Sequence, residues 1–289
     1  MTTLGILIAI ALLLLVAYRI AFEPWMARWG ATEIEATRTF PGDELWPNPT
    51  RVETRALTIG APVSRVWAWL NQIGQDRGGF YSYSVLENLF GAHIRNADRI
   101  LPNVPPLQAG ARLWYTPREA FGGTGYSEIV RVDPARMIVL VGHSGKNPAP
   151  NGTWSFFLEP IGQAETRLVT RGLGGNSRQP VLQRLFERFI MAPTHFVMER
   201  RMLLGVKERA EGQRTSSAQD LVEVTPWLVA IALTVAGAIG AMLAVEPGWW
   251  LAVFAAGASG LLVLPLLRPP AVLSIAWVLL GAAAAVVAL

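Results

Sequence analysis

The stretch that decides the fold is residues 52–67, VETRALTIGAPVSRVW, in which a strand pattern runs directly into the start of a helix. Small and β-branched residues at 52, 54, 56 and 58 alternate with residues 51, 53, 55 and 57, and this alternation predicts a β-strand. Pro62 suits the first turn of a helix. Val66, Trp67, Leu70 and Ile73 then fall on one face at helical spacing. A strand followed by a helix therefore opens the water-soluble part of the chain.

Further strands and a long helix are predicted downstream of this stretch. After residue 106, runs rich in aromatic and β-branched residues are separated by short turns, which favours an antiparallel meander over βαβ crossovers. The predicted strands are Arg112–Thr116, Tyr126–Val132, Met137–Val141, Thr153–Leu158 and Thr166–Arg171. Residues 180–210 predict a long helix with a kink or restart at Pro193. Its expected buried stripe is Leu182, Phe186, Phe189, Phe196 and Leu203.

This order of elements is similar to the helix-grip fold, an α+β architecture in which a curved antiparallel sheet wraps a long C-terminal helix. Over about residues 50–211 the sequence resembles the SRPBCC (START-like, polyketide cyclase/dehydratase-like) superfamily. The residues that carry the resemblance are APVSRVW at 61–67, WSFFLEP at 154–160 and TRL at 166–168. Four more segments resemble an uncharacterised, membrane-anchored bacterial branch: GGFYSY at 78–83, LEN at 86–88, NADRI at 96–100 and HFVMER at 195–200.

Both ends of the chain are strongly apolar. Four runs are each long enough to cross roughly 30 Å of hydrocarbon as a helix: Leu4–Phe22, Pro226–Val245, Trp249–Leu267 and Ala271–Leu289. The first run has no side-chain charge before it and no good cleavage site before Pro24, so we expect a retained anchor rather than a signal peptide. In the C-terminal runs, small residues leave flat surfaces for close helix contact: Gly237, Gly240, Gly257 and Gly260.

The expected organisation is a transmembrane anchor (1–22), a linker (23–50), a helix-grip domain (51–215) and three transmembrane helices (226–289). Basic residues gather near the membrane ends on the side of the soluble domain, among them Arg19, Lys207 and Arg268. By the positive-inside tendency, the domain is expected to be cytoplasmic, with both termini on the opposite side of a bacterial cell membrane.

Composition argues against several kinds of site and partner. The chain has no cysteine, so disulfides, zinc-thiolate sites and thiol nucleophiles are excluded. His93, His143 and His195 lie in separate predicted elements without metal-ligand spacing, so no metal and no cofactor is expected. The net charge is +4, but the basic residues are scattered, and we expect no nucleic-acid partner. The oligomeric state does not follow from the sequence.

The resemblance implies a mostly apolar pocket between the sheet and the final helix, with a few polar groups fixing the ligand. A planar guanidinium, at Arg77 or Arg99, is expected to hold an anionic head group. Ordinary core packing of the aromatic residues and turn bracing by the polar ones is the alternative. The candidate ligand-binding residues are Arg77, Tyr83, Asn96, Arg99, Trp114, Trp154, Phe196 and Glu199.

Three functions remain open at this point. The first is membrane-tethered binding of a hydrophobic or amphipathic small molecule, lipid or polyketide-like, in the helix-grip cavity. The second is an enzyme of cyclase or dehydratase type, with acid/base residues drawn from Tyr81, Glu87, Asp98 and His195. His195 and Glu199 are four residues apart, and thus on one helix face. The third is a non-catalytic regulatory or scaffold membrane protein. Catalysis requires at least two of the four acid/base candidates to converge on one cavity.

Overall fold

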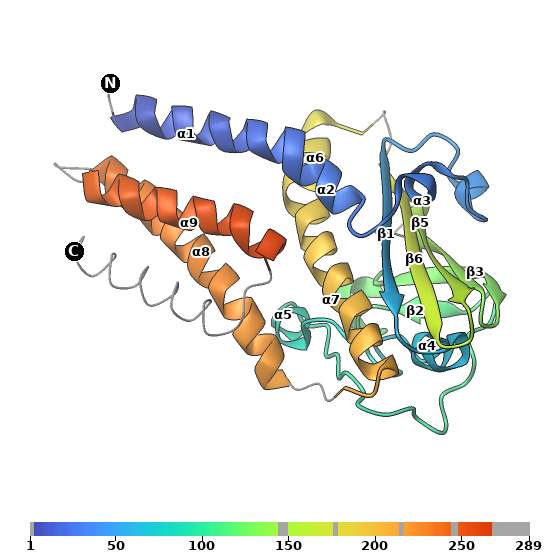
Figure 1. Cartoon of the computed structure of the whole chain (residues 1–289). Coiled ribbons are helices and arrows are strands. Elements are labelled where there is room, and N and C mark those ends of the chain that lie inside the picture. Colours follow the sequence, from blue (N-terminus) through green and yellow to red (C-terminus); the bar gives the residue numbers. More distant parts are fainter. Residues whose placement is uncertain (1–2, 144–149, 176–178, 214–216, 244–247, 268–289) are drawn as a thin grey trace. The chain divides into compact units, whose positions relative to one another are not determined.

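The computed structural model describes residues 3–143, 150–175, 179–213, 217–243 and 248–267 (Figure 1). The chain divides into two compact units. The first, which we call the grip unit, comprises residues 25–215. The second, the apolar unit, comprises residues 1–24 together with 216–289.

The grip unit is built on a six-stranded sheet in the order β1-β6-β5-β4-β3-β2, in which neighbouring strands are antiparallel. The first strand of the chain pairs with the last, with Leu57 opposite Leu168. All the predicted strands are present, and the mixed α+β class with an antiparallel sheet is confirmed. The strands are β1 (Arg51–Ile59), β2 (Arg112–Trp114), β3 (Tyr126–Asp133), β4 (Met137–His143), β5 (Pro150–Ile161) and β6 (Glu165–Gly174).

The long final helix, α7 (Ala192–Ala210), lies along the sheet (Figure 1). Pro193 sits in its first turn, so the helix restarts there as predicted. It follows α6 (Val181–Phe186) and a π-helical turn, η4 (Glu187–Met191). The other helical elements of this unit are α3 (Glu33–Thr37), η2 (Asp43–Leu45), α4 (Val63–Leu70), α5 (Ser84–Leu89) and η3 (Ala120–Gly122), while α2 (Glu23–Ala27) lies at the boundary between the units.

The inner face of the sheet, which faces α7, carries the main apolar core. Because side chains alternate along a strand, Leu57 and Ile59 of β1 share this face with Leu168 of β6. Each fully buried Leu or Ile side chain stabilises the fold by about 1.5–3 kcal/mol. From the strands the core takes Leu57, Ile59, Leu113, Ile129, Ile138, Leu140, Phe156, Leu158 and Leu168, and from α7 it takes Met202, Leu203, Val206 and Ala210.

The expected linker of residues 23–50 differs from the structure, because residues 31–44 fold onto the outer face of the sheet. Phe40 is buried and its ring lies 4.7 Å from that of Phe157, beside Ala56 and Val169. These strand residues are apolar and need a cover, since a sheet face left open to water cannot bury them. The segment is rich in polar residues and proline, so its sequence does not predict that it covers the sheet.

The expected buried stripe of residues 182–203 is present only in part. Phe196 and Leu203 are buried, but Leu182 is 79% exposed and Phe186 is 53% exposed. The π-helical turn η4 lies between the two sets. A π turn holds more residues than an α turn and so rotates the faces before and after it relative to each other. The apolar side chains of α6 therefore remain at the surface.

Of the four membrane spans expected in the apolar unit, the described residues support one. Among the described residues, one helix is long and apolar enough to cross a membrane by length and composition, Asp220–Leu243 within α8 (Ser217–Leu243). The first helix, α1 (Thr3–Ala17), has 15 α-helical residues before a π-helical turn, η1 (Tyr18–Phe22), and is about 22 Å long. The run 249–267 forms α9 (Gly248–Leu267), of which the side chains of 261–267 lie outside the described part, as does the run 271–289.

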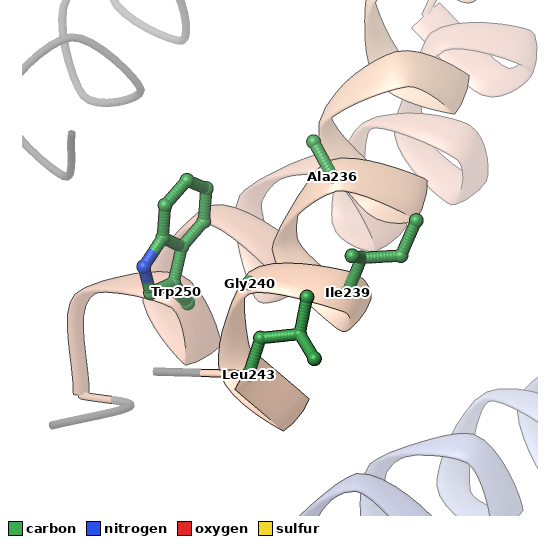
Figure 2. Close-up of a pocket in the computed structure, with 5 residues that line it drawn as sticks. All are labelled: Ala236, Ile239, Gly240, Leu243 and Trp250. Atoms are coloured by element: carbon green, nitrogen blue, oxygen red, sulfur yellow. The ribbon is translucent and has the colours of Figure 1, made fainter. Parts of the chain in front are cut away.

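Glycines bring α8 and α9 into close contact, as predicted for three of the four positions. A Cβ at Gly237 would lie 2.3 Å from the backbone nitrogen of Phe254, and one at Gly257 would lie 2.4 Å from that of Thr234. A Cβ at Gly240 would meet the ring of Trp250 at 2.1 Å. Figure 2 shows the shallow apolar groove beside this last contact. The groove has a volume of about 540 Å³ and is lined by Ala236, Ile239, Gly240, Leu243 and Trp250.

We expect Gly237→Val to destabilise the α8–α9 contact by about 1–3 kcal/mol, because the new side chain has no room against the backbone of α9. The measurement is thermal unfolding of the full chain in detergent. Ala232→Val is the matched control, since Ala232 is exposed on the same helix. Equal melting temperatures for the two variants would contradict this packing.

A second prediction concerns Glu35, which joins the covering segment to β6. Its carboxylate accepts hydrogen bonds from Arg167 Nε at 2.7 Å and Nη2 at 2.8 Å, and it closes a capping box with Thr32. The bond with Arg167, helped by Thr32 and opposed by burial, lowers the pKa of Glu35 from 4.5 to about 2. The stabilisation is therefore complete above about pH 4.5 and is lost as the pH falls toward 2.

Glu35→Gln is expected to reduce the free energy of unfolding at neutral pH by on the order of 2 kcal/mol and to flatten its decline in acid. Denaturant titrations at a series of pH values measure both effects. Glu33→Gln is the control, because the Glu33 side chain is 75% exposed and its ion pair with Arg28 is at the surface. An acid-stability profile unchanged by Glu35→Gln would disprove the assignment.

Candidate functional site

A cluster of polar side chains lies between the sheet and α7, and we call it the Arg55 cluster: Glu53, Arg55 and Glu199, which are buried, with the partly buried Trp154 and the exposed His195. Arg55 is its centre and is 1% exposed. Its Nε donates to the backbone oxygen of Met26 at 2.7 Å, and its Nη1 donates to Glu199 Oε2. Its Nη2 lies 3.0 Å from Glu53 Oε1. Two of the three guanidinium nitrogens thus donate hydrogen bonds, while Nη2 makes an ion pair with Glu53 and no hydrogen bond within the described residues.

Strand register explains how residues far apart in the sequence meet here. Glu53 of β1 lies opposite Gly172 of β6, and Gly172 lies opposite Trp154 of β5. The three form one row across the inner face. Gly172 contributes no side chain to this row between the carboxylate of Glu53 and the indole of Trp154, and we call this position the notch. A Cβ at Gly172 would lie 3.4 Å from Glu53 Oε2.

The second carboxylate of the cluster, Glu199, is held in its ionised form. Burial raises the pKa of Glu199, but the charge of Arg55 outweighs burial, with help from His195 and from the hydrogen bond of Trp154, so the pKa lies below its ordinary value. The indole Nε1 of Trp154 donates to Glu199 Oε1 at 2.7 Å. Both oxygens of Glu199 therefore have a donor. In turn, burial lowers the pKa of Arg55, but Glu199 and Glu53 outweigh it and raise the pKa above its ordinary value.

Aromatic rings surround the cluster on the sheet side. The ring of Trp154 lies 4.6 Å from that of Phe156, 6.3 Å from that of Tyr115 and 6.0 Å from that of His195, centroid to centroid. The hydroxyl of Tyr115 lies 2.7 Å from that of Ser127, and burial raises the pKa of Tyr115 to about 12 despite this hydrogen bond. Tyr115 is therefore a neutral phenol at physiological pH.

This end of the interior stays accessible, unlike the apolar core below it. Trp154 and Tyr115 belong to the inner face, yet both are only partly buried. The His195 side chain is 43% exposed, although its Nδ1 lies 3.9 Å from Glu53 Oε2. Inward-facing aromatic and polar groups with accessible surface are what a ligand pocket offers.

Three of the predicted ligand-binding residues meet at this site: Trp154, Phe196 and Glu199. Phe196 is 1% exposed, and its ring packs edge-on against Trp25 at 5.2 Å. The guanidinium of Arg55 lies 5.3 Å from the centre of the Phe196 ring. Phe196 thus forms a buried support under the cluster, while Trp154 faces its accessible side.

The other five predicted residues lie elsewhere. Arg77 Nη2 donates to the backbone oxygens of Asn71, at 2.6 Å, and Pro105, so it braces a loop. Arg99 is exposed. Tyr83 is buried, with the guanidinium of Arg201 5.9 Å from its ring centre. Trp114 is on the outer side of β2, its ring 5.1 Å from that of Tyr126.

Asn96, the fifth, acts as a brace for the backbone at Tyr81. Its Oδ1 accepts from the backbone nitrogen of Tyr81 at 2.7 Å, and its Nδ2 donates to the backbone oxygen of Ser82 at 2.8 Å. Tyr81 has a φ of +58°, a left-handed conformation that needs such support. The polar richness of residues 75–99 therefore serves the loop that packs on α7.

The four acid/base candidates do not converge. The hydroxyl of Tyr81 donates to the backbone oxygen of Trp69 and accepts from Gln72, both at 3.0 Å, and burial raises its pKa. Asp98 is exposed, and Glu87 lies on α5, which contributes no fully buried residue. Of the four, only His195 is part of the Arg55 cluster. In the part of the chain that the structure describes, no group of three or more acidic or histidine side chains could hold a metal ion.

Sequence reasoning did not single out Glu53 and Arg55, the core of the site. A signal for them exists in the pattern of β1. Residues 53 and 55 are in phase with Leu57 and Ile59, so a face that is apolar at one end of the strand is charged at the other. Charged residues in phase with core residues are rare unless they are paired inside the protein.

Comparisons with known proteins add little to this geometry. No family model matches the chain, and no curated protein matches it. Among solved structures, a protein from Thermobifida fusca is 14% identical with a TM-score of 0.37, over 57% of this chain and 97% of its own. A Polyketide_cyc-like protein from Corynebacterium glutamicum is 18% identical with a TM-score of 0.28, over 54% and 88%.

A third similar structure is CalC, a self-sacrificing resistance protein from Micromonospora echinospora. It is 11% identical with a TM-score of 0.34, over 57% of this chain and 97% of its own. With TM-scores and identities this low, these similarities carry no argument about the ligand or activity of the chain.

Removing Arg55 leaves two buried carboxylates without their cation, so we expect Arg55→Met to reduce the free energy of unfolding by about 3–5 kcal/mol. The double variant Arg55→Met/Glu199→Leu should recover part of this loss, because one of the two uncompensated charges is removed with it. Denaturant unfolding of the full chain in detergent measures both.

Arg131→Met is the surface control for this prediction. Arg131 pairs with Glu44 at 3.2 Å, with side chains 46% and 56% exposed, and such pairs contribute about 0–1 kcal/mol. If Arg55→Met reduced the free energy of unfolding no more than this control does, Arg55 would not hold the cluster together.

Proposed function

We propose that this protein binds a hydrophobic or amphipathic small molecule, lipid or polyketide-like, at the accessible end of the grip interior, and that it does so while tethered to a membrane. The observation that carries the proposal is the contrast within one sheet face. Below Phe156 the inner face is filled by buried apolar side chains, while at the Arg55 cluster Trp154, Tyr115 and His195 keep accessible surface beside the notch at Gly172.

The side chains at the accessible end of the grip interior suit an amphipathic ligand. Trp154 and Tyr115 offer flat apolar surface, and the charged groups beside them offer a few fixed polar contacts, which together orient a ligand. The antiparallel sheet with its long final helix also supports the proposal that the chain is a membrane-anchored branch of the SRPBCC superfamily.

Tethering is supported by the helix that follows the grip unit. Fewer than ten residues separate the end of α7 at Ala210 from Asp220, where the bilayer-length part of α8 begins. Such a connection spans at most about 35 Å even when fully extended. A grip unit joined to a membrane helix by so short a connection would remain near the molecules that partition into the bilayer. We propose the cytoplasmic side, on the basis of the basic residues that flank the apolar runs.

The enzyme alternative has less support, because its four acid/base candidates do not share a site. The scaffold alternative has one observation in its favour. The surface of α6 and η4 exposes six large apolar side chains: Val181, Leu182, Leu185, Phe186, Ile190 and Met191.

The experiment is photolabelling of the full chain, reconstituted in phosphatidylcholine vesicles, with a long-chain alcohol that carries a diazirine in its tail. Labelled peptides are mapped by mass spectrometry, and the label on α8 serves as an internal reference for membrane insertion. We expect label on β5, β6 and α7 peptides. Label confined to the apolar unit would contradict the proposal and leave the scaffold alternative.

Gly172→Val is expected to reduce labelling of the grip unit by about tenfold, because its side chain fills the notch beside Glu53. Thr153→Val is the matched control. It places the same side chain on the neighbouring strand, but on the outer face, since Thr153 is opposite Leu173. Equal labelling of both variants would place the ligand elsewhere.

A further inference from the structure

We infer that the polar end of the ligand is a hydrogen-bond donor, a hydroxyl or an ammonium group, received by Glu53 Oε2, and that ligands with an anionic head group are rejected. This inference rests on the proposed function and specifies the chemical class of molecule that the Arg55 cluster accepts.

Arg55 is the buried cation of the cluster, and two carboxylates share its charge. Each nitrogen of Arg55 already faces an oxygen of the protein, at Met26, Glu199 and Glu53. Arg51 stands at the rim, 39% exposed, with its Nε 3.8 Å from Glu53 Oε1. His195 lies on the side of Oε2. An entering carboxylate or phosphate would thus meet the charges of Glu53 and Glu199 while Arg55 is occupied by them.

One acceptor of the cluster remains open. Glu199 Oε1 and Oε2 each accept a hydrogen bond, from Trp154 and Arg55. Glu53 Oε1 lies between Arg51 and Arg55. For Glu53 Oε2, the described part of the chain supplies no hydrogen bond, and the ionisable donor beside it is His195 Nδ1, 3.9 Å away. The residue is 6% exposed, and Oε2 keeps part of that accessible surface.

The position of this oxygen ties it to the ligand site. Glu53 Oε2 points toward the notch at Gly172, where a Cβ would lie 3.4 Å from it. On the other side of the notch lies Trp154. A donor group placed in the notch meets an ionised acceptor, and charge-assisted hydrogen bonds of this kind are shorter and stronger than neutral ones. The apolar part of the same molecule then lies against the rings of Trp154 and Tyr115.

This conclusion reverses the expectation that Arg77 or Arg99 would hold an anionic head group. Both arginines lie outside the cluster, the first bonded to loop carbonyls and the second at the surface. Within the cluster, the polar atom left without a hydrogen bond on the Glu53 side is an acceptor, Oε2.

The test uses three diazirine probes with the same twelve-carbon chain, ending in an amine, an alcohol or a carboxylate. Each is applied to the full chain in phosphatidylcholine vesicles, and labelling of β5, β6 and α7 peptides is divided by labelling of α8. We expect the amine and the alcohol to label the grip unit, and the carboxylate to label it about tenfold less. Equal labelling by all three probes, or preference for the carboxylate, would overturn the inference and leave the proposed function standing.

Glu53→Gln separates charge from shape, because the amide keeps an acceptor oxygen in a side chain of the same size. In this variant we expect the advantage of the amine over the carboxylate to fall by about tenfold, with labelling by the alcohol little changed. Glu159→Gln, a partly exposed carboxylate on β5, is the control.

If Glu53→Gln fails to fold, the ranking of the three probes on the unaltered chain still tests whether the site prefers a donor head group to an anionic one. If no probe labels the grip unit, the proposed function fails, and the inference fails with it.

Discussion

The grip unit depends on one buried cation. Arg55 lies between the two carboxylates of Glu53 and Glu199 and a backbone oxygen at Met26, so it joins β1, α7 and the segment that leads in from the apolar unit. Burying three charged groups costs a large desolvation free energy. Their mutual attraction offsets this cost only while all three remain together. The need to keep these three charges together determines the arrangement of side chains around the Arg55 cluster.

The same requirement shapes the candidate site. Arg55 binds Glu199, and Glu199 in turn accepts a hydrogen bond from the indole of Trp154, which lies in one row with Gly172 and Glu53. A ligand in such a place does not have to organise its own polar partners. Preorganised groups lower the entropy lost on binding, which is one way that a small site gains affinity.

Much of the fold could be predicted from the sequence, because it depends on local alternation. The strands and the restart of the helix at Pro193 follow from periodicity and from the chemistry of proline. The cover formed by residues 31–44 could not be predicted, since Phe40 and Glu35 make their contacts with Phe157 and Arg167, more than a hundred residues later. The prediction of the site residues failed for a related reason. Arg77, Asn96 and Tyr81 are unusual residues that brace a loop, while Glu53 and Arg55 look like an ordinary solvated strand until the phase with Leu57 is noticed.

The pairing of β1 with β6 has a consequence for how the protein is made. The partners of β1 lie over a hundred residues further along the chain, so at 5–20 residues per second the ribosome supplies them on the order of ten seconds after β1 emerges. Until then Arg55 and Glu53 stay hydrated, and the N-terminal apolar helix has already left the exit tunnel. The N-terminal helix is thus synthesised well before the sheet can close, and a chaperone that shields unpaired strand edges would act in that interval.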